Sequence, residues 1–127
     1  MIEFDEVPGT EQNLGLPPEP SQEPKAGFAL ILCTAPPGGG DGIARALVDE
    51  RLAACVNIAQ VRSYFVWKGK PSDEREELLL IKTEMRLAEK VRARIKELHS
   101  YELPEIIVLP IAGGDEGYLE WMSKSVG

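Results

Sequence analysis

The sequence has little of the chemistry on which most enzyme active sites depend. Its 127 residues include one histidine, His99, and two cysteines, Cys33 and Cys55. One histidine excludes a histidine cluster and the HExxH motif, and the GxSxG, CxxC and phosphate-binding Gly-Lys-Ser/Thr patterns are also absent. Two cysteines do not make a disulfide framework, so we expect a reducing compartment, the cytoplasm.

The sequence also lacks long hydrophobic runs and an excess of basic residues. Its longest apolar runs are far shorter than the ~20 residues that a membrane helix needs, and no basic region followed by an apolar run indicates a signal peptide. Lys and Arg number 14 against 21 Asp and Glu, a formal net charge of -7. Phosphate binding needs clustered basic side chains, so we expect neither nucleic acid nor an anionic membrane as a partner.

The negative charge is concentrated in the first 25 residues, which hold six acidic residues, one basic residue and five of the ten prolines. Such a segment buries too little apolar surface to offset its ordering entropy, so residues 1–25 are predicted to be a disordered tail. The spacing of Pro17 and Pro20 fits a PxxP ligand, and the alternative is a solubilising leader. Residues 26–127 form the predicted folded domain.

The hydrophobic pattern of residues 26–127 alternates between strand and helix periods. Thr83 is expected to cap the second helix, as Asp41 is expected to cap the first. The expected elements are a strand at 28–34, a helix from 41 to 52, a hairpin of strands 54–67 and 75–83, a helix at 85–98, a strand at 105–111 and a short last helix near 118–122.

This order predicts an α+β fold, a ferredoxin-like βαββαβ(α) sandwich with a long hairpin between its second and third strands. The first strand is apolar on both faces, whereas a sheet with one wet face alternates apolar and polar residues. The helices cover only one face. We therefore expect a homo-oligomer in which sheets pack against sheets.

Few residues suggest a ligand site. The glycine run 38–42 precedes a helix, where backbone amides hold phosphate, but without a lysine a capped flexible loop is the better interpretation. The acidic run 73–77 is interpreted as a solvated edge. Cys33, Cys55 and His99 have the thiol and imidazole groups that suit copper or zinc. The alternative is a buried cysteine and a histidine that stabilises a helix C-terminus.

Several stretches resemble one family, the CutA family of divalent-cation tolerance proteins. The similarity covers roughly residues 27–126, with the motifs in the same order and at compatible spacing. The motifs are LCTAP at 32–36, RLAACVNI at 51–58, Ser63-Tyr64 with Trp67 and Gly69, LIKT at 80–83, HSYELPEI at 99–106 and YLEW at 118–121.

The resemblance implies a tight homotrimer, similar to the PII signalling proteins, in the cytoplasm. It also implies a non-catalytic role in tolerance of copper or another divalent cation, with no organic cofactor. The family's proposed copper ligands correspond to Cys33 and His99, and Cys55 is a further thiol. Leu98 stands where the family has another histidine, and Ser100 replaces a proline, so one proposed ligand is missing.

A second function, a PII-like sensor of small ligands or an interaction scaffold, stays open. Its intersubunit clefts would be lined by aromatic, acidic and basic side chains, in which a lysine beside the rings would hold a small anion. Packing at the trimer interface is the alternative role for the aromatic residues. The candidate residues are Tyr64, Trp67, Lys68, Lys82, Tyr101 and Glu102.

Overall fold

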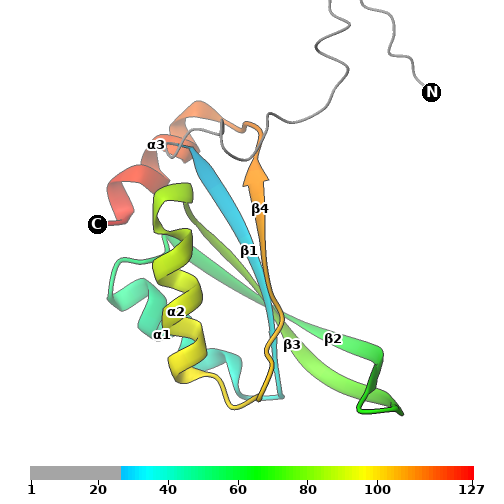
Figure 1. Cartoon of the computed structure of the whole chain (residues 1–127). Coiled ribbons are helices and arrows are strands. Elements are labelled where there is room, and N and C mark those ends of the chain that lie inside the picture. The colour runs from blue at the N-terminus through cyan, green and yellow to red at the C-terminus, as the bar shows by residue number, and fades with distance from the viewer. Residues whose placement is uncertain (1–26) are drawn as a thin grey trace, which may run out of the picture.

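The computed structural model describes residues 27–127, so the predicted tail at 1–25 lies outside the described residues. The elements follow the predicted order (Figure 1). They are β1 (Phe28–Ala35), α1 (Gly40–Asp49), β2 (Cys55–Trp67), β3 (Lys70–Glu84), the 3-10 helix η3 (Met85–Leu87), α2 (Ala88–Leu98), β4 (Ile106–Ile111) and α3 (Glu116–Ser125). None of the helices in this part of the chain is long and apolar enough to cross a membrane.

The four strands form one antiparallel sheet in the order β2-β3-β1-β4, which confirms the predicted α+β fold. Helices α1 and α2 lie together on one face of this sheet, and α3 lies at the end opposite the hairpin (Figure 1). Strands β2 and β4 are the two edges, so each leaves one row of backbone groups without a partner strand among residues 27–127.

The hydrophobic core lies between the sheet and its two covering helices. Alternate residues of β1 point into it, and Ile31 lies beside Ile81 of β3 in the sheet register. Both are fully buried against Leu47 of α1 and Ile95 of α2. Each such side chain contributes roughly 1.5–3 kcal/mol when removed from water, so this layer stabilises the subunit.

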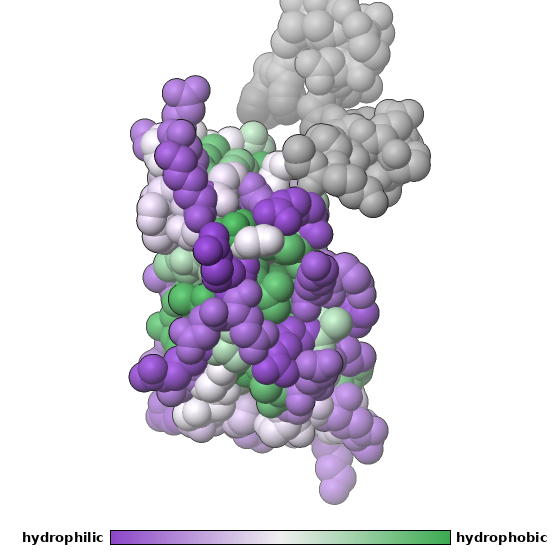
Figure 2. Space-filling model, turned by 90° about the vertical axis from the view of Figure 1, so that its left-hand side faces the viewer, coloured by the Kyte–Doolittle hydropathy of each residue, from purple (hydrophilic) through white to green (hydrophobic). Residues whose placement is uncertain are grey.

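The opposite face of the sheet has an apolar centre that no element of residues 27–127 covers, and we call it the open face. Ile107 and Leu109 of β4 expose 46% and 40% of their surface. Beside them lie other partly exposed leucines of the central strands, Leu30, Leu32, Leu78 and Leu80. By contrast, Figure 2 shows that the helix-covered side is mostly hydrophilic. The structure thus confirms that the first strand is apolar on both faces.

The β2–β3 hairpin extends beyond the rest of the sheet. Strand β1 ends at Ala35 beside Glu77, whereas β2 and β3 stay paired from there to Trp67 and Lys70. The two turn residues, Lys68 and Gly69, have φ values of 52° and 80°, as a two-residue type I′ turn requires. The third strand therefore begins at Lys70, five residues before the predicted start.

Both helix caps predicted from the sequence are wrong. Asp41 lies in the first turn of α1 and accepts a hydrogen bond from Arg45, while Gly39 is the capping position. Thr83 belongs to β3, where its hydroxyl donates to the carbonyl oxygen of Leu52 over 2.6 Å. A threonine can satisfy its hydroxyl locally in either setting, so the residue type alone does not distinguish the two.

The start of α1 is held by a distant carboxylate, that of Glu77. Its two oxygens accept hydrogen bonds from the backbone N–H groups of Gly38 and Gly40, both at 2.9 Å. A Cβ at position 40 would lie 2.7 Å from Glu77 Oε1, so a larger residue there would displace this carboxylate. These backbone hydrogen bonds lower the pKa of Glu77. The interpretation of the acidic run as a solvated edge is therefore correct only in part: Asp73 and Glu74 are exposed on the hairpin beyond the end of β1, whereas Glu77 is built into the fold.

We predict that Glu77→Gln lowers the midpoint of urea unfolding at pH 7, because an amide supplies one acceptor oxygen where the carboxylate supplies two. Since folding lowers the pKa of Glu77, its stabilisation is present above the ordinary value of 4.5 and is lost as the pH falls through the folded-state pKa. The difference between the two proteins should therefore shrink in acid. Asp41→Asn is the control on the same helix, and an equal loss in it would contradict the role of Glu77.

Candidate functional site

Cys33, the first predicted metal ligand, is buried at the helix-facing side of β1. Its Sγ lies 3.7 Å from the carbonyl oxygen of Thr34, and none of its surface is exposed. Burial, together with the nearby negative charges of Glu105 and Glu76, raises the pKa of this thiol to about 12. Since the thiolate is the form that binds metal, the folded environment of Cys33 opposes metal binding.

His99, the second predicted ligand, is at the C-terminal cap of α2, as the sequence predicted. Its Nδ1 accepts a hydrogen bond from the backbone N–H of Tyr101 over 3.0 Å. Its Nε2 lies 2.7 Å from the carbonyl oxygen of Thr34, so Nε2 carries the hydrogen and donates it. Both ring nitrogens are therefore used to join the end of β1 to the loop after α2.

Cys55 lies on the other side of the sheet from Cys33. It begins β2 beside Lys82, which places it on the open face, and its Sγ is 3.9 Å from Asn57 Oδ1. Within residues 27–127, no group of three or more His, Cys, Asp and Glu side chains is arranged to hold a metal ion. The three predicted ligands therefore do not fit a four-coordinate copper or zinc centre within one subunit.

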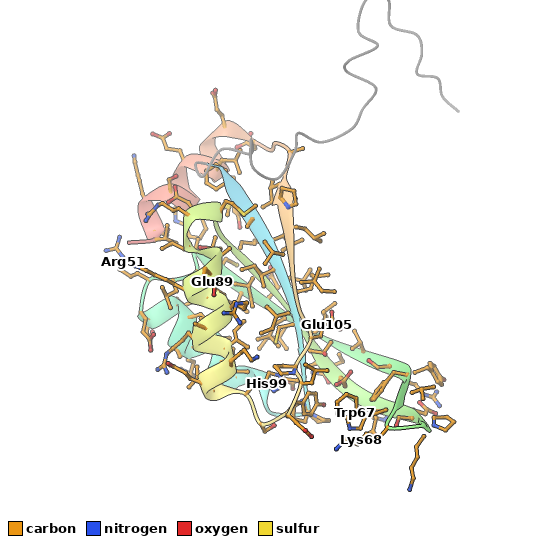
Figure 3. The ribbon with its side chains drawn as sticks, viewed as in Figure 1. Arg51, Trp67, Lys68, Glu89, His99 and Glu105 are labelled. Atoms are coloured by element: carbon orange, nitrogen blue, oxygen red, sulfur yellow. The ribbon has the colours of Figure 1, made fainter. Side chains whose placement is uncertain are left out.

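A cleft of about 820 Å³ lies between the extended hairpin and the loop that follows His99. Figure 3 shows Trp67 on the hairpin and Glu105 at the start of β4, on the two sides of this region. The lining comes from β1, from both strands of the hairpin and from the loop: Thr34, Ser63, Tyr64, Phe65, Trp67, Ser72, Glu74, Glu76, Ser100, Tyr101, Glu102, Leu103 and Glu105.

Tyr64, Trp67, Tyr101 and Glu102, which were expected to line clefts between subunits, line this cleft within one chain. Lys82 does not, because it lies toward the other end of the sheet, where its Nζ is 5.7 Å from the centre of the Tyr118 ring. Its position in β3 places it six residues beyond Glu76, about 20 Å along an extended strand. Lys82 is therefore outside the cleft of its own chain, and its place in a cleft between subunits stays a prediction.

Glu76 is the buried member of the cleft lining, and the sequence analysis did not name it as a site residue. It exposes 6% of its surface, and its Oε2 accepts a hydrogen bond from the Tyr101 hydroxyl over 2.7 Å. Burial and then this carboxylate raise the pKa of Tyr101, so the phenol stays protonated and donates. The alternation of β3 could have found it, because Glu76 lies two residues from Leu78 and therefore on the open face.

The comparisons with known proteins identify the class to which this fold belongs. Residues 29–125 match the family described as "CutA1 divalent ion tolerance protein". The chain belongs to this family, as the motifs in its sequence indicated.

Three relatives illustrate the similarity. The divalent-cation tolerance protein CutA of Thermus thermophilus is 48% identical over 67% of this chain and 84% of its own length, and its structure has a TM-score of 0.75 over 79% of this chain and 99% of that one. The chloroplastic protein CutA of Arabidopsis thaliana is 45% identical over 68% of this chain and 48% of its own. The PII-like protein CutA of Nostoc is 36% identical, with a TM-score of 0.75 over 78% and 97% of the two chains.

We predict that Cys33 is inert toward thiol reagents in the folded protein. In a Cys55→Ser variant, which leaves Cys33 as the only thiol, the reaction with Ellman's reagent at pH 8 should be at least about a thousandfold slower than in urea. Three pKa units of suppressed thiolate account for that factor. Rapid stoichiometric reaction of the native variant would show that the thiol is accessible. A Cys33→Ser variant gives the matching rate for Cys55.

Proposed function

We propose that this protein serves divalent-cation tolerance as a non-catalytic, cytoplasmic homotrimer. The observation that carries the proposal is the open face of the sheet, which has an apolar centre of leucines and isoleucines and no covering element in residues 27–127. A single leucine left in water instead of buried forfeits roughly 1.5–3 kcal/mol, and the open face has several. Further copies of the same chain supply surfaces that match it in chemistry.

The two sheet edges also favour self-assembly. Strands β2 and β4 each have one unpaired edge, and a free edge of one copy can pair with a free edge of the next. Because the two edges of one subunit belong to different strands, such contacts are heterologous, and they form a ring when the rotation between copies closes. A ring of three agrees with the trimer that the family resemblance implies.

A non-catalytic role is supported by the use of the only histidine. His99 is the side chain that most often acts as a general acid or base, but both of its nitrogens are bonded to backbone groups. The cytoplasmic location rests on two free cysteines that lie on opposite faces of the sheet. Copper or another divalent cation is the ion expected from the family's role. The geometry of Cys33, Cys55 and His99 favours a tolerance role in which a single subunit has no preformed metal centre.

The homotrimer predicts a specific response to charge on the open face. Wild-type protein should sediment as three copies of the 14.0 kDa chain at micromolar concentration, and Ile107→Asp should shift it toward monomer, because an unpaired carboxylate would be buried at the interface. Val48→Asp on α1 is the matched control, because Val48 and Ile107 expose 42% and 46% of their surface. A wild-type monomer, or equal dissociation of both variants, would contradict the proposal.

Metal titration tests whether the folded chain holds a thiol-dependent centre. We expect isothermal titration of Cu(I), Cu(II) and Zn(II) into reduced protein to give the same heats for wild type and Cys33→Ser, because the thiol is buried and protonated. His99→Ala should instead lower the free energy of unfolding by about 1–3 kcal/mol, the usual effect of leaving buried backbone groups unpaired. A stoichiometric copper site that disappears in Cys33→Ser would contradict this expectation and support the ligand set that the sequence suggested.

A further inference from the structure

Helix α2 and the short η3 turn before it form a basic segment in an otherwise acidic domain. Residues 85–98 hold five basic side chains and two acidic ones, whereas the rest of residues 27–127 holds eight basic and thirteen acidic ones. Helices α1 and α3 each carry more acidic than basic residues. The surface of α2 therefore attracts negative charge that the rest of the domain repels.

Two of these basic side chains, Lys90 and Lys96, have no acidic partner in the part of the chain that the structure describes. The three arginines of the segment each pair with a nearby glutamate. The two lysines are exposed, and no ion pair joins either of them to another side chain of residues 27–127. Two positive charges on α2 are thus left for a partner from outside these residues.

The two lysines lie on the exposed side of α2, with Ala93 between them. Residues three apart are neighbours on a helix surface, so Lys90, Ala93 and Lys96 follow one another along the helix. The small side chain of Ala93 lets another segment of chain lie close to the helix. This side is away from the open face, so the packing of open faces in the proposed trimer does not cover it (Figure 1).

The chain enters the folded domain beside the start of this basic segment. The backbone N–H of Met85 donates a hydrogen bond to the carbonyl oxygen of Gly27 over 2.8 Å. Figure 1 shows that β1 and α2 begin at the same end of the sheet. Residues 1–25 are therefore attached next to the first turn of α2.

Residues 1–25 carry the charge that α2 lacks, with six acidic residues and one basic residue. Glu23 is four residues before Gly27, a reach of up to about 14 Å along an extended chain. Lys90 is five residues after Met85, about 8 Å along the helix. A carboxylate of this segment can therefore reach a free lysine of the same chain.

This attachment favours residues 1–25 over an anionic partner from solution. A short tether keeps two groups at an effective concentration in the millimolar range, which a free partner must exceed. A segment that buries too little apolar surface to fold alone is still attracted by opposite charge. Because each exposed charge pair contributes about 1 kcal/mol or less, the contact is reversible and sensitive to salt.

We propose that residues 1–25 bind along the exposed side of α2 in the same chain, with Glu23 and Glu19 paired with Lys90 and Lys96. The bound segment neutralises the basic helix and covers it against other anionic partners. The inference goes beyond cation tolerance and does not depend on it.

Carbodiimide coupling in the full-length protein tests this contact, because it joins a carboxylate to an amine only where the two meet. At low ionic strength, Glu19 and Glu23 should couple mainly to Lys90 and Lys96, and mass mapping of peptides identifies the pairs. Coupling within one chain leaves the mass at 14.0 kDa on a denaturing gel, whereas coupling between copies doubles it.

Lys124 on α3 is the internal control. It lies two residues after Met122, whose cluster packs against Phe28 at the start of β1, so it is also near the point where the tail is attached. Its helix is acidic, however, and its Nζ already pairs with Glu120. Tethering alone predicts coupling to Lys124 as well as to Lys90, whereas binding along α2 predicts a several-fold preference for Lys90.

Charge variants separate binding from chance contact. Lys96→Gln should lower coupling at Lys90 about two- to fivefold, the effect of one exposed charge pair. Lys70→Gln removes the same charge at the hairpin end of the sheet and should leave it unchanged. Sodium chloride at 1 M should suppress the preference for Lys90, because it shortens the screening length to about 3 Å.

Equal coupling to Lys90 and Lys124, or coupling that 1 M salt leaves unchanged, would overturn the proposal. So would coupling of Lys90 only to another copy, or only to carboxylates of residues 27–127. Sedimentation of the same samples reports the assembly separately, so a failure of coupling in intact trimers contradicts this inference and leaves the proposed trimer standing.

Discussion

The rest of the structure depends on the packing of β1, which lies in the sheet interior and is apolar on both faces. One face, through Ile31, meets the helices and completes the subunit core. The other face, through Leu32, meets Leu80 and Ile107 on neighbouring strands and then stops at the surface. In a subunit built in this way, only one of the two apolar faces of β1 is removed from water. Its fold and its proposed assembly are therefore two consequences of one hydrophobic pattern.

The element order, the antiparallel sheet and the two-faced strand were predictable because they follow from periodicity, which is a local property of the sequence. The caps were not, since the polar side chains of Thr83 and Asp41 bond to other partners instead, the carbonyl oxygen of Leu52 and the side chain of Arg45. The polar residues that matter most have partners far away in sequence. Glu77 reaches Gly40 across the sheet end, and its role could not be found before the register of β1 and β3 was known.

The candidate site was predictable in part for the same reason. The family motifs pointed to Trp67, Tyr101 and Glu102, all of which line the cleft. The motifs did not indicate that the cleft is negatively charged. Part of this charge comes from Glu74 and Glu76, on a strand whose length was underestimated. Lys82 lies outside this cleft because position along a strand, not residue type, decides which end of the sheet a side chain reaches. The thiol and imidazole groups were predicted to be metal ligands. In the fold, the His99 ring instead forms hydrogen bonds that join a loop to β1.

The start of α1 has a further chemical meaning. A glycine-rich loop that leads into a helix presents unpaired backbone N–H groups and the positive end of the helix dipole, the usual receptor for a phosphate. Here the receptor is occupied from within, because the two oxygens of Glu77 take the positions that two oxygens of a bound anion would take. The chain thus carries its own counter-ion at this loop, and the loop keeps its shape without any solute.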